Sequence, residues 1–127
     1  MVYWRTSIGA LILPTQTIKV FGQLRHEELL DAAHIIPDSS PEGEPRITNG
    51  IALCKLHHAA FDSFIIGVSP DYSVHVRRDI LEEADGPILK YGLQLLHGSQ
   101  LTLPHYPDHW PNREALQWRF ERFKAAA

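Results

Sequence analysis

The sequence predicts a single α+β domain in which short strands and helices surround one modest core. Three observations predict this fold class: a near-continuous apolar run at Leu29–Ile36, two β-branched segments separated by a turn within 64–77, and helical spacing of apolar residues near the C-terminus. The chain has 127 residues, of which 44% are hydrophobic and 21% charged. This composition is that of one soluble globular domain.

The first segment, residues 1–23, predicts short strands but no clear role. Ile8–Leu13 and Thr17–Phe21 are rich in β-branched and apolar residues. Neither run approaches the roughly 20 apolar residues of a membrane span, and the order of segments in a signal peptide is missing. We therefore expect no membrane association and a cytoplasmic location.

The second segment, residues 24–80, begins with the run Leu29–Ile36, which Asp31 and His34 interrupt and Pro37 ends. This pattern predicts a buried strand that carries two polar groups. The residues that follow, 38–50, are mostly Ser, Pro, Gly, Glu, Asp, Thr and Asn, which is typical of a loop.

The rest of this segment predicts a helix and a pair of strands. After the apolar Ile51–Leu53, the stretch Lys55–Ser63 has helical spacing, with His58 and Asp62 four positions apart on one face. Phe64–Val68 and Ser73–Arg77 then predict two strands, because both are rich in β-branched residues and the turn sequence of residues 69–72 separates them.

The third segment, residues 81–127, is predicted to be an extension of the same domain. A short helix is expected around 86–97, and the Pro- and His-rich stretch 101–110 is expected to be extended. Asn112 is a predicted cap for a closing amphipathic helix, with Leu116, Phe120 and Phe123 on the core side and Arg119, Arg122 and Lys124 on the opposite side.

Composition directs attention to imidazole chemistry. The single cysteine, Cys54, excludes an intramolecular disulfide, whereas eight histidines are many for so short a chain. The net charge of −3 argues against tight nonspecific binding of nucleic acid, which needs an excess of Lys and Arg. Any nucleic-acid contact must therefore come from local groups of basic residues.

Three polar residues stand at a suggestive spacing: His34 in the strand, Asn49 at the end of the loop and His58 on the following helix. Hydrolysis of a phosphodiester needs a base that takes a proton from water and a cation that offsets charge on the phosphate. Imidazole suits the first task, and imidazole or carboxylate suits the second. The three residues are therefore candidate catalytic residues.

The stretch Asp31-Ala-Ala-His-Ile-Ile-Pro37, followed by Asn49-Gly-Ile-Ala-Leu-Cys-Lys-Leu-His-His-Ala-Ala-Phe-Asp62, resembles the motif of HNH, or ββα-metal, endonucleases. It is most similar to the subgroup whose motif begins with Ala-His-Ile. Asn49 and His58 have the nine-position spacing of that motif, which selects His58 over His57. The resemblance is strong over residues 24–80 and looser beyond them.

The resemblance implies a metal-dependent DNA endonuclease with weak sequence preference or nicking activity. His34 would act as general base, Asn49 would fix the loop, orient His34 or touch the metal, and His58 would be a metal ligand. Mg²⁺ is the expected ion, with Mn²⁺, Ni²⁺ or Zn²⁺ as further candidates, and double-stranded DNA is the expected partner. A homodimer is compatible with the resemblance, and the family would fit a role in restriction, phage defence or a mobile element.

Two departures from the family pattern concern metal ligands. Many members have a ligand immediately before the first motif histidine, where this chain has Ala33. Asp31, on the same strand face and about 6.6 Å away along a regular strand, is one replacement, and Asp62 is the other. Many members also hold structural zinc with two Cys pairs, but here only Cys54 and His57 stand at the second pair and Lys19–Gly22 offers no ligand, so no complete zinc site is expected.

Two alternatives remain open at this level. The chain could be a catalytically silent nucleic-acid-binding domain that keeps the fold without the ligand at Ala33, or the nuclease fragment of a larger restriction-type protein. Candidate DNA contacts are the basic residues Arg77, Arg78, Arg119 and Arg122, with Trp118 available to stack on an unpaired base. Each of these residues has the simpler interpretation of a solvated surface group.

Overall fold

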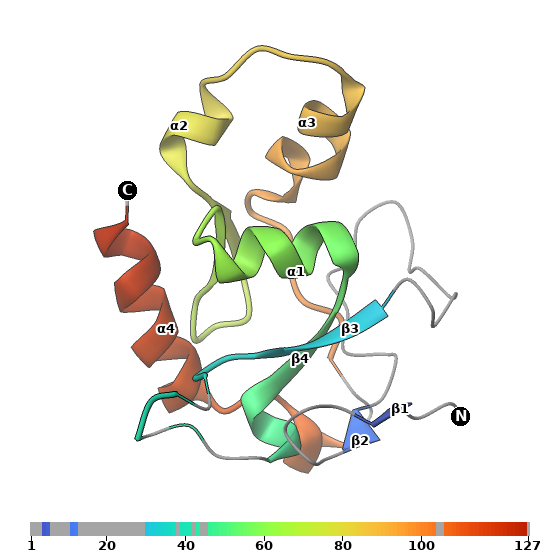
Figure 1. Cartoon of the computed structure of the whole chain (residues 1–127), viewed down its shortest axis with the longest axis vertical. Helices are drawn as coiled ribbons and strands as arrows, with labels where there is room; N and C mark the ends of the chain where they lie inside the picture. The colour runs from blue at the N-terminus through green and yellow to red at the C-terminus, as the bar shows by residue number, and fades with distance from the viewer. Residues whose placement is uncertain are drawn as a thin grey trace.

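The structure is a computed structural model of the chain, and it describes residues 4–5, 11–12, 30–37, 39–41, 43, 46–103 and 106–126. It consists of short strands and helices (Figure 1). In order, the elements are β1 (Trp4–Arg5), β2 (Leu11–Ile12), β3 (Leu30–His34), η2 (Ile47–Asn49), β4 (Gly50–Cys54), α1 (Lys55–Asp62), β5 (Ile66–Val68), β6 (Val74–Val76), α2 (Arg78–Leu81), α3 (Pro87–Gly92), η3 (Gln94–Leu96), η4 (Pro107–His109) and α4 (Arg113–Ala125). None of the described helices is both long and apolar enough to span a bilayer.

The strands form antiparallel pairs, and the pair β3–β4 leads directly into α1. Its register runs from Leu30 opposite Cys54 to His34 opposite Gly50. The backbone passes from Cys54 straight into the helix, where the Cys54 Sγ atom accepts a 3.4 Å hydrogen bond from the His57 amide and so caps the first turn. In the described part of the chain, β1 pairs with β2 and β5 with β6 in the same antiparallel manner.

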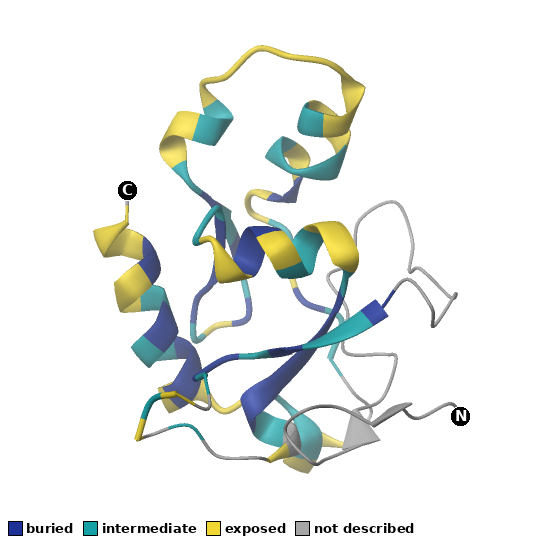
Figure 2. Ribbon diagram, viewed as in Figure 1, coloured by how far each residue is buried: buried dark blue, intermediate teal, exposed yellow. Residues whose placement is uncertain are grey.

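The core lies between the β3–β4 pair, α1, the β5–β6 pair and α4 (Figure 2). Its most completely buried side chains include Ile51, Phe61, Ile66 and Leu116. Helix α4 lies especially close to β5, because a Cβ atom added at Gly67 would come within 2.5 Å of the Phe123 ring. The C-terminal helix is therefore packed tightly onto the strands that follow α1.

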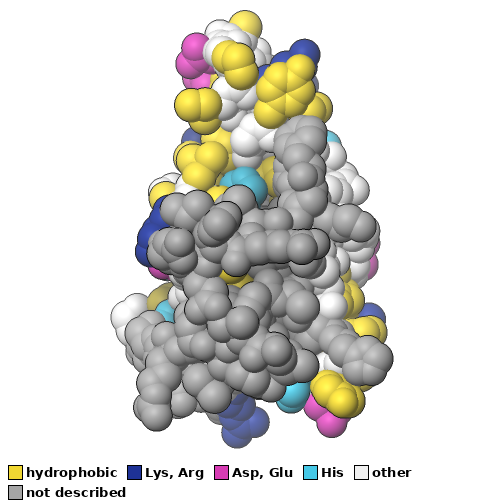
Figure 3. Space-filling model, turned by 90° about the vertical axis from the view of Figure 1, so that its right-hand side faces the viewer, with side chains coloured by type: hydrophobic (Ala, Val, Ile, Leu, Met, Phe, Trp, Pro, Cys, Tyr) yellow, Lys and Arg dark blue, Asp and Glu magenta, His cyan; other side chains and the backbone are white. Residues whose placement is uncertain are grey.

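The far end of the molecule, at α3 and η3, carries several exposed hydrophobic side chains. Figure 3 shows hydrophobic groups at its upper end, away from the β3–β4 pair. Ile88 is exposed to 75%, and Tyr91 and Leu95 are also exposed. These side chains take no part in the core described above.

The mixed α+β class is confirmed, and so are the elements that the strongest patterns predict. The run Leu29–Ile36 contains β3, the stretch Lys55–Ser63 contains α1, and the two segments within 64–77 form β5 and β6. Within the predicted Ile8–Leu13 strand, β2 occupies Leu11–Ile12, while Thr17–Phe21 lies outside the described residues. Strand β1 was not predicted from the sequence.

Two C-terminal expectations were wrong in part. The stretch 101–110 is not extended throughout, because Pro107 begins the 3-10 turn η4, which the Trp110 amide closes on the Pro107 carbonyl. Asn112 caps α4 as predicted, since its Oδ1 atom accepts a hydrogen bond from the Ala115 amide at 2.9 Å. However, Arg119 lies on the buried side of this helix, whereas Phe120 is only half-buried.

Candidate active site

His34 is the last residue of strand β3, and the loop that connects β3 to β4 begins directly after it. It is half-buried, and its Nε2 atom is shielded from solvent. Gly50 lies directly opposite it on β4. The position of the His34 side chain therefore depends on how firmly the two ends of this loop are held together.

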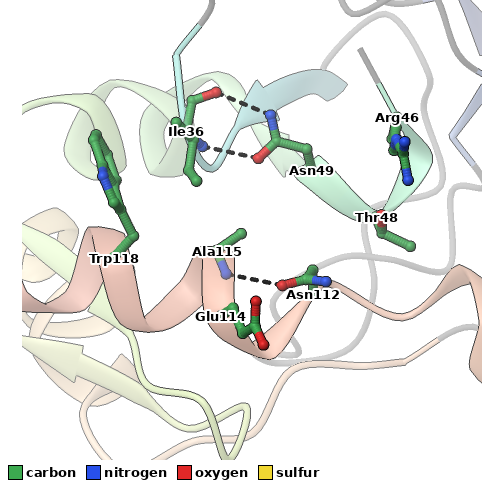
Figure 4. A pocket seen from close by; sticks show the side chains of 8 residues that line it. All are labelled: Ile36, Arg46, Thr48, Asn49, Asn112, Glu114, Ala115 and Trp118. Atoms are coloured by element: carbon green, nitrogen blue, oxygen red, sulfur yellow. Dashed lines mark hydrogen bonds between the residues drawn. The ribbon is translucent and has the colours of Figure 1, made fainter. Parts of the chain in front are cut away.

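Asn49 fastens those two ends (Figure 4). Its Oδ1 atom accepts a hydrogen bond from the Ile36 amide, and its Nδ2 atom donates one to the Ile36 carbonyl, both at 2.9 Å. The Asn49 carbonyl also accepts a 3.0 Å hydrogen bond from the Ile35 amide. Asn49 is buried, with a residue exposure of only 6%, and it is placed to fix the backbone just after His34 rather than to contact a metal.

Replacing Asn49 by Ala should lower the free energy of unfolding by about 2 kcal/mol, because the Ile36 amide and carbonyl would be buried without partners. Urea denaturation measures this loss. Asn112→Ala is the control, since it removes a helix cap worth about 1 kcal/mol and leaves Ile36 untouched. Equal stability of Asn49→Ala and the unmodified protein would contradict this role of Asn49.

His58 on α1 lies between two carboxylates. Its Nδ1 atom is 3.0 Å from Asp31 Oδ2 on β3, and its Nε2 atom is 3.2 Å from Asp62 Oδ2, one helical turn further along α1. The strand contact arises because α1 packs against β3, and the Asp62 contact follows from helical spacing. All three side chains remain partly exposed, so solvent and a ligand reach the group.

Asp31 has a second partner, the Nζ atom of Lys55, which contacts its Oδ1 atom. The hydrogen bond with His58, followed by the one with Lys55, lowers the pKa of Asp31 below its ordinary value. The Asp31 carboxylate is therefore ionised at neutral pH. Both of its oxygens have partners: Oδ2 faces the Nδ1 atom of His58, and Oδ1 contacts the Nζ atom of Lys55.

The donor chemistry fits a divalent cation in part. Over the described residues, no group of three or more His, Cys, Asp or Glu side chains is placed to hold a metal ion. The pair His58 and Asp62 nevertheless offers an imidazole nitrogen and a carboxylate oxygen 3.2 Å apart. Neighbouring ligands about 2.1 Å from an octahedral ion are about 3.0 Å apart, so the spacing suits two ligands of one ion.

Cys54 and His57 have local structural contacts. The Cys54 sulfur caps α1, and the His57 Nε2 atom lies 2.8 Å from the Gly92 carbonyl of α3. His57 therefore links α1 to α3. The segment Lys19–Gly22 lies outside the described residues.

Arg119 is the main correction to the predicted DNA contacts. The sequence predicted it on the solvent side of α4, but its side chain is buried, with a residue exposure of 6%. Its Nη1 atom donates to the Ile35 carbonyl at 3.0 Å and its Nη2 atom to the Phe61 carbonyl at 2.8 Å. Arg119 lies between Leu116 and Phe123 at helical spacing, so it shares their buried face.

The other predicted DNA contacts are accessible to different degrees. Arg77 binds Asp79 through two hydrogen bonds, whereas Arg78 pairs with Glu82 and has an 86% exposed side chain. Arg122 is exposed, and its guanidinium lies 3.4 Å from the centre of the Trp118 ring. Arg77 and Arg78 line a depression together with Ala126, which places them beside the C-terminal end of α4.

A second depression, of about 340 Å³, lies between the loop after β3 and the first turns of α4 (Figure 4). Arg46 and Thr48 border it on the loop side, and Glu114 and Trp118 border it on the helix side. It adjoins Asn49 and Ile36, so it opens beside the backbone that follows His34. Sequence patterns had not indicated this depression.

Comparison with known proteins places the site in a family context. Residues 16–69 match the family described as HNH endonuclease. A solved structure titled "Modification dependent TagI restriction endonuclease" is similar in fold, with a TM-score of 0.50, 17% sequence identity and coverage of 73% of this chain. This chain spans 27% of the length of that chain, and no curated protein sequence matches.

The match to HNH endonuclease covers β3, β4, α1 and β5, the elements that carry His34, Asn49 and His58. The similar solved structure agrees with the fold, and the family match supports a nuclease function for this chain. HNH endonucleases generally use a divalent metal ion, and a nuclease acts on nucleic acid, here expected to be DNA.

Proposed function

We propose that this chain is a metal-dependent DNA endonuclease that hydrolyses phosphodiester bonds with weak sequence preference, cutting or nicking double-stranded DNA. The observation that carries the proposal is His58, held on α1 between Asp31 and Asp62 beside the strand that ends at His34. This arrangement lies within the segment that matches HNH endonuclease. An imidazole beside carboxylates and a second imidazole on the adjoining strand are the groups that such hydrolysis requires.

We assign the metal to the Nε2 side of His58, with Asp62 as the second protein ligand. Asp31 is the less suitable ligand, because Lys55 already neutralises it and it faces the other ring nitrogen. A carboxylate that accepts a hydrogen bond from the far nitrogen of a ligating histidine orients the ring and raises its basicity. Asp31 is therefore proposed to position His58, which revises the expectation that it replaces the ligand missing at Ala33.

The remaining residues act around this pair. A divalent ion, when bound, supplies positive charge that offsets the charge developing on the phosphate and the leaving oxygen. His34 is proposed to accept the proton of the attacking water. Asn49 holds the Ile36 backbone and so keeps His34 in place. Mg²⁺ is the proposed ion, because it takes carboxylate and phosphate oxygens with several waters.

The proposed DNA contacts are Arg78 and Arg122, which are exposed, and Arg77, which neighbours Arg78. Arg119 is not a proposed DNA contact, because its side chain is buried. We further propose that the domain works within a longer restriction-type protein, since the similar restriction endonuclease is much longer than this chain. A homodimer is proposed as the working form, with sedimentation in solution as its test.

Cleavage of supercoiled plasmid by the purified protein with Mg²⁺, Mn²⁺, Ni²⁺, Zn²⁺ or EDTA tests the proposal. We expect nicked or linear product with Mg²⁺ and none with EDTA. The second candidate, a silent DNA-binding domain, has Ala33 and the two-ligand pair in its favour. A folded protein that binds the plasmid but leaves it intact with every ion would establish that alternative.

A further inference from the structure

The buried guanidinium of Arg119 joins the two elements that carry the proposed catalytic groups. One of its nitrogens donates to the carbonyl of Ile35, the residue after His34, and another donates to the carbonyl of Phe61, the residue before Asp62. The Nη2 atom is also 3.9 Å from the Asp62 Oδ1 atom. A single side chain from α4 therefore contacts the end of β3 and the end of α1.

The contacts depend on the shape of the guanidinium. Its rigid fork presents two donors to two carbonyls, while the flat faces lie against Phe61 and Phe64, with ring centres 4.1 and 4.8 Å away. A lysine has one ammonium on a flexible stem and cannot reproduce this bridge between carbonyls. The geometry is thus specific for arginine rather than for positive charge.

Burying this charge is costly. Burial lowers the pKa of Arg119, and the carboxylate of Asp62 only partly offsets that effect. Its Nε atom, also buried, makes no hydrogen bond to any described residue. Apolar side chains often stabilise such a position as well as a buried ion does, so stability alone gives little reason for an arginine here.

We propose that Arg119 is a positioning residue for the nuclease site, one that sets the separation of His34 from the pair His58 and Asp62 by holding the Ile35 and Phe61 carbonyls and steering the Asp62 carboxylate. This inference rests on the proposed nuclease function. Arg119 is not placed to touch DNA or the reacting phosphate, because its side chain is buried. A displacement of about 1 Å at a catalytic group can cost 100-fold in rate, so the bridge has a measurable effect.

Arg119→Lys is the main test, and Arg113→Lys on the same helix is the matched control. Arg113 is exposed and lies over the Tyr72 ring, away from the nuclease residues. For Arg119→Lys we expect a folded protein whose kcat for plasmid nicking falls about 10- to 100-fold while KM changes little, because positioning affects the transition state more than DNA binding. Arg113→Lys should match the unmodified protein.

Two readouts are independent of cleavage. Mn²⁺ affinity, measured by electron paramagnetic resonance, should fall about tenfold in Arg119→Lys, because Asp62 loses its orientation. In the unmodified protein, Mg²⁺ addition should shift the guanidinium NMR signals of Arg119, which lies 3.9 Å from Asp62. Both measurements remain informative if the protein cuts no plasmid, and the Mg²⁺ titration of the unmodified protein remains informative if Arg119→Lys fails to fold.

A double-mutant cycle with Asp62→Asn completes the test. If Arg119 acts through Asp62, the losses of Mn²⁺ affinity in the two single variants should not add in the double variant. Normal kcat and Mn²⁺ affinity in a folded Arg119→Lys variant would overturn the proposal, as would an Arg119 guanidinium signal that is unmoved by Mg²⁺. If the unmodified protein binds Mn²⁺ and shows these shifts without cleaving DNA, the proposed function fails while the positioning role stands.

Discussion

His34→Ala is expected to lose metal-dependent plasmid cleavage by about 10²- to 10⁴-fold, which is the usual contribution of a general base. Among the described histidines, only His34 lies at the end of β3, next to the Ile36 backbone that Asn49 binds. No other described histidine can therefore act as the base at this position. Cleavage under single-turnover conditions measures the loss, because it isolates the chemical step from product release.

This variant should keep its metal. His34 is three residues along β3 from Asp31, or about 10 Å at the usual rise, and the proposed ligands lie on α1. Mn²⁺ affinity should therefore equal that of the unmodified protein. His75→Ala, at a half-buried histidine on β6, controls for the general effect of removing an imidazole. Cleavage by His34→Ala at a tenth or more of the normal rate would exclude His34 as the base.

His58→Ala is expected to remove both cleavage and metal affinity, because it deletes the imidazole ring that lies between Asp31 and Asp62. In this variant, calorimetric titration with Mn²⁺ should show no binding, and the plasmid assay should show no cleavage. His57→Ala is the matched control on the same helix, since His57 contacts the Gly92 carbonyl instead of the carboxylate pair. Normal Mn²⁺ binding by His58→Ala would place the ion elsewhere.

The two carboxylate variants identify which side of His58 takes the ion. Asp62→Asn removes a charged ligand and should weaken Mn²⁺ binding more than Asp31→Asn does, because Asp31→Asn removes only the group that orients the ring. Loss of such an orienting partner typically costs 10- to 100-fold in affinity or activity. The reverse order, with Asp31→Asn the more damaging change, would assign the ion to the Nδ1 side of His58.

Local patterns predicted the elements that carry the site. The apolar run interrupted by Asp31 and His34 corresponds to β3, and the spacing of His58 and Asp62 corresponds to one face of α1. These predictions succeeded because strand and helix periodicity depend on neighbouring residues. The Asn112 cap succeeded for the same reason, since its partner is the Ala115 amide three residues away.

The partners of the site residues could not be predicted in this way. Asn49 was expected to fix the loop, orient His34 or touch the metal, and the fold shows both of its amide groups bound to the Ile36 backbone. Asp31 was one of two candidate replacements for the ligand missing at Ala33, and only the fold shows that α1 brings Lys55 and His58 to it. Such choices depend on how a helix packs on a strand, which no spacing of residues encodes by itself.

The sequence by itself determined the α+β class, the strand-loop-helix order and the spacing of His34, Asn49 and His58, because these follow from short-range periodicity and turn chemistry. Only the tertiary structure decided the surroundings of Arg119. Its charge predicted a solvent-exposed position, but its place between Leu116 and Phe123 buries it near the ends of β3 and α1. The carbonyls it binds lie far away in sequence, so their meeting is fixed by the packing of α4 against the core.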